Sequence, residues 1–164
     1  MKRRIIFLVA LFIGAPVALF AQSGDEAENA RIVESKNYVF KAQSVTPQRG
    51  ATRHLTSEYD LAVAVDTVIS FLPYFGRAFS APLNPGEGGI KFTSADFEYK
   101  ASKKTKKKRW DITIIPKDAG QAYRLNLTIF TNGYASLQVN SNNHQPISFY
   151  GYIVAGKPKD KKAF

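Results

Sequence analysis

The sequence predicts an all-β domain with one short amino-terminal helix and about eight or nine antiparallel strands arranged as a meander. Two observations carry this prediction. Apolar and polar residues alternate with a period of two over most of the chain after Tyr38, and the segments between the alternating stretches are short. Successive side chains of a strand point to opposite faces, so the alternation indicates strands with one buried and one solvated face. A meander of this size removes its edges by closing into a barrel. A two-sheet sandwich is the alternative.

The amino terminus has the three-part pattern of a secretory signal peptide. Lys2, Arg3 and Arg4 precede an uncharged stretch over residues 5–20, and small residues surround the predicted cleavage site after Ala21. The positive start holds the amino terminus on the inner side while the apolar stretch enters the membrane. At about 16 residues, the stretch is shorter than the roughly 20 that a spanning helix needs. We expect an exported protein, periplasmic or extracellular, with no membrane span after cleavage. An uncleaved anchor is the alternative.

The mature chain is long enough for one domain with a core of its own. Cysteine is absent, so the fold depends on packing without disulfides. Ser23 followed by Glu26 fits a capping box at the start of a helix. The predicted organisation is a signal peptide over 1–21, a helix over 22–37, a β-barrel domain over 38–154 and a basic disordered tail over 155–164.

Nine strands follow from the alternation and from the apolar stretches between turn residues. The predicted strands cover residues 38–45, 59–66, 68–74, 89–93, 96–101, 110–115, 123–130, 135–140 and 147–154. Asn132-Gly133 separates two of them and favours a type I′ hairpin turn, because both residues tolerate positive φ. A run of basic residues from Lys103 to Arg109 joins two alternating stretches. We therefore place it at a hairpin tip.

The formal net charge of +10 is unevenly distributed. The predicted signal peptide, the run from Lys103 to Arg109 and the tail carry the excess, so the body of the domain is close to neutral. The basic run fits a solvated tip that discourages strand aggregation. An acidic component of the cell envelope is its alternative partner. Nucleic acid is not expected, because the lysines are not interleaved with aromatic residues and the protein is exported.

The residue patterns of common enzymes are missing from the sequence. His54 and His144 have neither metal-ligand spacing nor a neighbouring carboxylate pair, and without cysteine there is no thiol nucleophile. No phosphate-binding glycine motif and no Gly-x-Ser-x-Gly motif is present. We therefore expect a protein that is not an enzyme and has no cofactor and no metal. A hydrolase assembled from scattered residues is the alternative.

Aromatic residues suggest a binding site near the one long loop. The predicted ligand-binding residues are Tyr74, Phe75, Arg77, Phe79, Phe149 and Tyr152. Aromatic side chains supply apolar area for a small ligand, and an arginine between small residues recognises a carboxylate or phosphate through paired hydrogen bonds. The alternatives are an ordinary core and an internal ion pair of Arg77 with Glu87 or Asp96.

Five segments resemble the family catalogued as domain of unknown function 4251. They are Leu72-Pro73-Tyr74-Phe75-Gly76-Arg77-Ala78, Gly88-Gly89-Ile90-Lys91-Phe92, Trp110-Asp111-Ile112, Gly133-Tyr134-Ala135 and Gln145-Pro146-Ile147-Ser148-Phe149-Tyr150-Gly151. The resemblance runs from about Ser35 to Ile153. It implies an exported envelope protein of Bacteroidota-type bacteria with a lipocalin-like barrel, and it implies no activity, cofactor or site. Many members look lipid-anchored, but this chain lacks the cysteine that would carry the lipid.

The combined expectation is an exported β-barrel protein without enzymatic activity, which binds a small apolar or acidic ligand in the cell envelope. A structural or inhibitory protein that uses its loops and has no ligand cavity is the first alternative. The two differ in the barrel interior: one filled by residues such as Trp110 and Phe97 leaves no room for a ligand.

Overall fold

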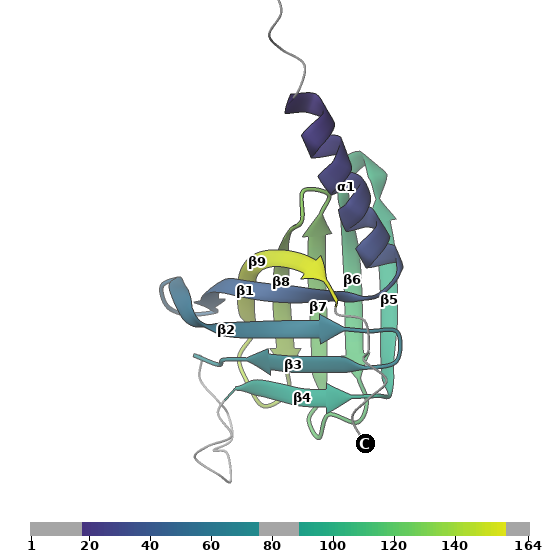
Figure 1. The fold of residues 1–164 in the computed structure, drawn as a ribbon. Helices are drawn as coiled ribbons and strands as arrows, with labels where there is room; N and C mark the ends of the chain where they lie inside the picture. The colour runs from purple at the N-terminus through teal and green to yellow at the C-terminus, as the bar shows by residue number, and fades with distance from the viewer. Residues whose placement is uncertain (1–17, 76–88, 157–164) are drawn as a thin grey trace, which may run out of the picture.

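The structure consists of one helix followed by nine strands (Figure 1). It is a computed structural model, which describes residues 18–75 and 89–156 and, of these, the side chains from Asp25 onward. The strands are β1 (Tyr38–Pro47), β2 (Arg53–Val63), β3 (Val68–Leu72), β4 (Ile90–Ser94), β5 (Phe97–Lys104), β6 (Arg109–Pro116), β7 (Tyr123–Phe130), β8 (Tyr134–Ser141) and β9 (Ile147–Ala155). All nine predicted strands are confirmed, most within two residues of the predicted ends.

The strands form a single antiparallel sheet that curls into a nearly closed barrel. Their order is β4-β3-β2-β1-β9-β8-β7-β6-β5, so two meanders, β1 to β4 and β5 to β9, are joined by the pairing of β1 with β9. β2, β3 and β4 run steeply across β5, β6 and β7 (Figure 1). Because the described strands belong to one continuous sheet, the two-sheet alternative is not the fold.

The inward face of the barrel is filled by buried apolar side chains from every described strand except the edge strand β5, whose Phe97 and Tyr99 are half-buried against the core. Alternate residues of β6, β7 and β9 are buried, as the sequence pattern predicts. The largest fully buried side chains are Tyr38, Phe40, Phe149, Leu61, Leu72, Ile90, Ile112, Ile114, Leu125, Leu127, Ile129 and Leu137. Trp110 is also buried, whereas Phe97 is half-buried at the edge. Burial of this apolar surface is the main source of stability, since the chain has no disulfide.

Helix α1 (Ala18–Glu34) packs its last turn against the core of the barrel. Ile32 and Val33 in its last turn are buried against the core. The chain then turns through Lys36, whose φ of 51° is left-handed, and the amide of Asn37 donates to the carbonyl of Ile32. This 6→1 bond is typical of a helix carboxyl terminus.

The helix begins earlier than the sequence predicts. The capping-box interpretation placed its start at residue 22 with Ser23 as the cap, but α1 starts at Ala18 and runs through Ser23. Alanine and leucine in the added turn are good helix formers, so local propensity carries the helix further back. The predicted cleavage after Ala21 thus falls within α1. Of the described helices, none is long and apolar enough to cross a membrane.

The two edge strands, β4 and β5, are consecutive in sequence and meet at a sharp corner. Asp118 holds this corner through three hydrogen bonds, accepting from the Ser94 hydroxyl, from the Ala95 amide at 3.0 Å and from the Asp96 amide at 3.2 Å. These bonds lower the pKa of Asp118, the one from Ser94 contributing most. β4 and β5 are the two ends of the sheet and do not pair with each other, and the Asp118 carboxylate stabilises the connection between them.

The basic run forms the predicted tip of the β5–β6 hairpin. A single 3-10 turn, Thr105–Lys107, reverses the chain, and Lys108 follows with a left-handed φ of 49°. Residues 101–108 are all exposed. The predicted disordered tail overlaps the end of β9 at Ala155, and residues 157–164 lie outside the described part of the chain.

Candidate functional site

Tyr74, the first predicted ligand-binding residue, holds two segments together. Its hydroxyl donates to the carbonyl of Gln145 at 3.2 Å, and its ring meets the ring of His144 edge-on with 4.6 Å between centroids. Partial burial raises the pKa of Tyr74 and lowers that of His144. Tyr74 thus joins the end of β3 to the β8–β9 connection, a structural role that occupies its hydroxyl.

The other predicted residues do not gather around Tyr74. Phe75 is exposed beneath the guanidinium of Arg53, with 5.5 Å from its ring centroid to Cζ. Arg77 and Phe79 lie outside the described residues. Phe149 and Tyr152 are both on β9 but on opposite faces: Phe149 is fully buried in the barrel and Tyr152 points outward. These two side chains cannot line one cavity.

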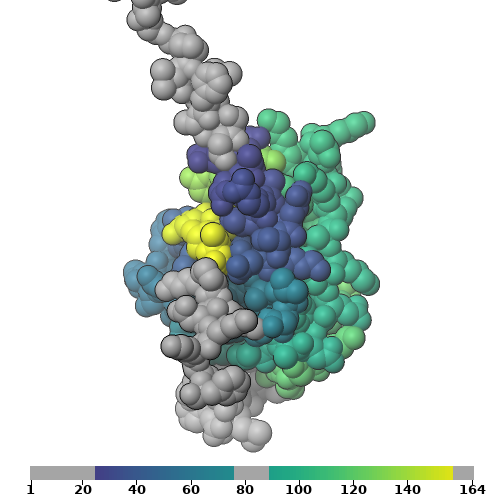
Figure 2. All heavy atoms as spheres, turned by 45° about the vertical axis from the view of Figure 1, so that its right-hand side comes forward, coloured from purple at the N-terminus to yellow at the C-terminus, as the bar shows by residue number. Residues whose placement is uncertain are grey.

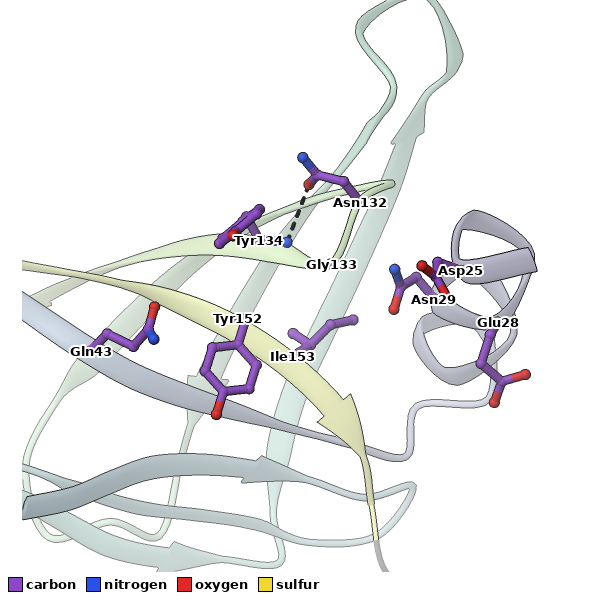
Figure 3. Close-up of a pocket in the computed structure, with 9 residues that line it drawn as sticks. All are labelled: Asp25, Glu28, Asn29, Gln43, Asn132, Gly133, Tyr134, Tyr152 and Ile153. Carbon is purple, nitrogen blue, oxygen red and sulfur yellow. Dashed lines mark hydrogen bonds between the residues drawn. The ribbon is translucent and has the colours of Figure 1, made fainter. Parts of the chain in front are cut away.

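Two adjoining hollows lie on the outer surface instead, over β1, β9 and β8, and α1 lines the first of them. The first, of about 460 Å³, is lined by Asp25, Glu28, Asn29, Gln43, Asn132, Gly133, Tyr134, Tyr152 and Ile153 (Figure 3). The second, of about 490 Å³, is lined by Gln43, Ser44, His54, Phe130, Tyr134, Ala135, Ser136, Tyr150 and Gly151. Because Gln43 and Tyr134 belong to both, we treat the two hollows as one surface and call it the outer groove.

A β-bulge in β1 places Gln43 between the two hollows. Against β9, Ala42 pairs with Gly151 and Ser44 pairs with Tyr150, so Gln43 is the extra residue. The pairing of β1 with β2 also shifts here, but the additional residues are then in β2. Gly151 of β9 lies opposite, and a Cβ built there would come within 1.8 Å of the Lys41 carbonyl oxygen. The close approach of two backbones explains the bulge, since an extra residue bends a strand and increases its twist.

The turn between β7 and β8 forms the wall beside α1. Gly133 has a φ of +86°, and its amide donates to the carbonyl of Phe130. The predicted hairpin is present, but the predicted type I′ turn is wrong, because Asn132 is not among the described residues with positive φ: a three-residue loop, 131–133, joins the strands, with Gly133 in the left-handed position. The Asn132 side chain accepts from the amide of Tyr134 at 3.2 Å (Figure 3). Asn29 of α1 donates to the carbonyl of Thr131 at 3.0 Å. The side chain of Asn29 therefore joins the helix to the turn.

Four aromatic side chains are exposed along the outer groove. They are Phe130 (39% exposed), Tyr134 (62%), Tyr150 (50%) and Tyr152 (38%). Tyr134 and Tyr152 are direct partners in the β8–β9 pairing, and Tyr150 pairs with Ser136 two residues along. Facing residues on neighbouring strands have Cβ atoms about 5 Å apart. The rings thus lie at neighbouring positions of the outer face, in the hollows that Gln43 and Asn132 also line.

The charge of the outer groove does not suit an acidic ligand. Asp25 and Glu28 stand at its helical wall, and Glu28 pairs with Arg31 at 2.9 Å. Among the described residues that line the groove, none is lysine or arginine. Within the described part of the chain, no three histidine or carboxylate side chains converge as metal ligands do. The arrangement therefore offers rings and amides to a neutral ligand.

Comparison with known proteins identifies the family. Residues 21–153 match the family described as "Domain of unknown function (DUF4251)". The chain belongs to this family. A DUF4251 family protein from Bacteroides eggerthii, known from a crystal structure at 1.95 Å resolution, is similar in fold, with a TM-score of 0.61 and 16% sequence identity over 83% of this chain and 91% of that one. No match is found among curated proteins. The family resemblance inferred from the five sequence segments is thus confirmed, and DUF4251 gives this chain a fold without an activity.

Proposed function

We propose that this DUF4251 protein is an exported binding protein without enzymatic activity, and that the outer groove holds a neutral saccharide, free or as part of a larger molecule. The observation that carries the proposal is the set of four exposed aromatic side chains in two adjoining hollows that amide groups also line. A contiguous exposed apolar surface with a polar rim is typical of interaction sites.

The aromatic rings and the amide groups of the groove each fit one part of a saccharide, its apolar face and its hydroxyl groups. The face of an aromatic ring carries partial negative charge, so the Tyr134 and Tyr152 rings attract the polarised C–H groups on the flat side of a sugar. The hydroxyls of a sugar need donors and acceptors within reach. Gln43 offers both, and Asn132 keeps its side-chain NH₂ as a donor because only its oxygen is engaged, with the Tyr134 amide.

The predicted acidic ligand depended on Arg77, which lies outside the described residues. The groove presents carboxylates and no cation among its described lining residues, so its lining has no charge that would attract a negatively charged ligand. A purely apolar ligand would leave the amides of Gln43 and Asn132 desolvated without partners, which costs free energy. A neutral ligand with hydroxyl groups and apolar faces avoids both disadvantages.

The non-enzymatic part of the proposal is supported by the state of the groove carboxylates. Hydrolysis of a glycosidic bond uses two carboxyl groups that flank the bond. Glu28 is engaged by Arg31 at 2.9 Å, and both groups lie on one helix wall, on the same side of any ligand in the groove. Release of reducing ends from a bound saccharide, abolished by Asp25→Asn, would contradict this part and favour the hydrolase alternative.

Titration calorimetry against a panel of neutral oligosaccharides tests the binding. Tyr134→Ala and Tyr152→Ala should each weaken binding about tenfold, since truncating an aromatic side chain at the centre of a binding site typically costs more than about 1 kcal/mol. Phe71→Ala is the matched control, because Phe71 is an aromatic residue of β3 with 46% exposure away from the groove. Equal losses in all three variants, or no binding to any saccharide by the unaltered protein, would reject the proposal. Binding only to a protein partner through the same tyrosines would support the interaction-protein alternative.

Export is tested separately by amino-terminal sequencing of the protein released by the cells that make it. We expect a chain that starts at Gln22. Retention of Met1 with membrane association would contradict cleavage and favour the uncleaved anchor.

A further inference from the structure

Two lysines of the β5–β6 tip are fastened to helix α1. Lys103 donates to Glu34 at 2.9 Å, and Lys108 lies 3.9 Å from Glu26. These two pairs bracket most of the described side-chain length of α1. In Figure 2, α1 (dark blue) lies between the end of β9 (yellow) and the β5–β6 region (green). The tip and the helix therefore form one end of the molecule, which we call the basic pole.

The other three lysines of the tip have no carboxylate partner in the described part of the chain. Lys104, Lys106 and Lys107 are exposed and take part in no ion pair there. Their position is fixed all the same, because the 3-10 turn Thr105–Lys107 reverses the chain and the Thr131 amide donates to the Lys108 carbonyl at 3.0 Å. Three unpaired cations are thus presented outward from a turn that is tied to the next hairpin.

The amino-terminal end of α1 is at the same pole. The helix begins at Ala18 and points away from the barrel on the side of the β5–β6 tip (Figure 1). It contains the last three residues of the uncharged stretch 5–20, the most apolar segment of the sequence. Unpaired lysines and the point where the predicted signal peptide joins the domain therefore share one end of the molecule before cleavage. The proposed saccharide groove has no part in this observation.

We propose that the basic pole docks on an anionic lipid bilayer, with Lys104, Lys106 and Lys107 facing the phosphate head groups. An anionic bilayer attracts basic residues within about a Debye length, roughly 10 Å at moderate salt. Each basic residue near such a surface strengthens binding by about fivefold. Docking in this orientation leaves the corner held by Asp118, at the other end of β5 and β6, directed away from the membrane.

A bilayer fits these observations better than a soluble polyanion. A nucleic-acid strand would need bases stacked on aromatic rings between the lysines, and the tip has none. An acidic polysaccharide would bind a basic patch anywhere on the surface and would not explain why, before cleavage, the patch shares its pole with the end of the chain that enters the membrane during export. Acidic polysaccharide therefore enters the experiment as a competing outcome.

Vesicle binding of the exported protein, purified from the cells that make it, tests the proposal. Phosphatidylcholine vesicles are compared with vesicles that also contain phosphatidylglycerol, so that any hydrophobic anchoring contributes equally to both. The unaltered protein should bind the anionic vesicles roughly 10- to 100-fold more tightly, and the preference should fall as salt is raised. The triple variant Lys104→Ser, Lys106→Ser, Lys107→Ser should lose most of the preference.

A control variant removes the same charge elsewhere: Arg49→Ser, Lys117→Ser, Arg124→Ser, at three exposed positions away from the tip. It should keep the preference, and both variants should melt within a few degrees of the unaltered protein, since exposed charges contribute little to stability. Equal affinity for both vesicle types, an equal loss in both variants, or binding to soluble acidic polysaccharide without binding to vesicles would each overturn the proposal.

Discussion

The two faces of β9 carry aromatic residues in opposite settings. Phe149 on the inner face is surrounded by the core, whereas Tyr150 and Tyr152 on the outer face have water or the outer groove beside them. Composition does not distinguish these settings, because both faces contain rings. The position in the alternation does, and it separates residues that hold the barrel together from residues that are free to meet a ligand. Substitutions on the two faces should therefore affect different measurements.

The largest effect should come from the inner face. Phe149→Ala removes a fully buried ring and should lower the free energy of unfolding by about 3–5 kcal/mol. Urea denaturation measures the loss, with Tyr150→Ala on the neighbouring position of the outer face as the control. A loss below about 1 kcal/mol for Phe149→Ala would mean that the cavity collapses, or that the inner face of β9 is less packed than described.

A smaller but still large effect is expected at Gly151, where the two backbones approach. The added methyl group of Gly151→Ala would meet the Lys41 carbonyl oxygen and force β1 and β9 apart. Overpacking of this kind costs about 1–3 kcal/mol. A second glycine, Gly120, cannot serve as the control, because its φ of +71° would add backbone strain to an alanine there. Ser148→Ala, on the same strand with its side chain half-buried, should change the free energy of unfolding little.

The hydrogen bond between buried Ser94 and the Asp118 carboxylate predicts that stability depends on pH. Among the described residues, only Ser70 and Ser94 are buried and polar, and Ser94 donates to Asp118. Hydrogen bonds hold the pKa of Asp118 below its usual value of about 3.9. The carboxylate therefore stabilises the fold above that pH, and its contribution is lost as the pH falls through the lower, folded-state pKa.

Thermal melting between pH 6 and pH 2 checks the sign, since the pKa of Asp118 is lowered. The melting temperature of the unaltered protein should decline at the acidic end of this range more steeply than that of Asp118→Ala. Identical slopes would show that the corner bonds do not depend on ionisation.

The smallest effect on stability should come from the outer face. Tyr152→Ser removes a side chain that is already exposed, so the free energy of unfolding should change by no more than about 0.5 kcal/mol. Saccharide binding should fall in the same variant. A loss of several kcal/mol would make Tyr152 a structural residue and would remove the distinction between the two faces.

The sequence predicts the strands well because their signal is local. Alternation in residues such as Leu125 and Leu127 sets which side is buried, and Asn132-Gly133 sets one hairpin turn. The helix start was less well predicted, because Ser23 is a good cap only if the preceding residues are not helical, and alanine and leucine there continue the helix.

The site was predicted less well than the fold for a physical reason. The alternation already places Phe149 and Tyr152 on opposite faces, so this part was readable from the sequence. Tyr150, on the same face as Tyr152, was readable in the same way. Gln43 was not, because its bulge depends on the approach of Gly151, more than a hundred residues away. The contribution of Asn29 likewise depends on how α1 meets a distant turn.

The pairing of Tyr38 with Ala155 joins the first and last strands, and this sets the order in which the barrel can form. A chain made from its amino terminus presents β1 long before β9 exists. Until then β1 pairs only with β2 and keeps one row of backbone amides and carbonyls open to any other strand. Contacts so distant in sequence form slowly, because the loop between them must close first. Completion of the barrel should therefore be the slow step of folding, and the period before it should be when the chain most readily aggregates.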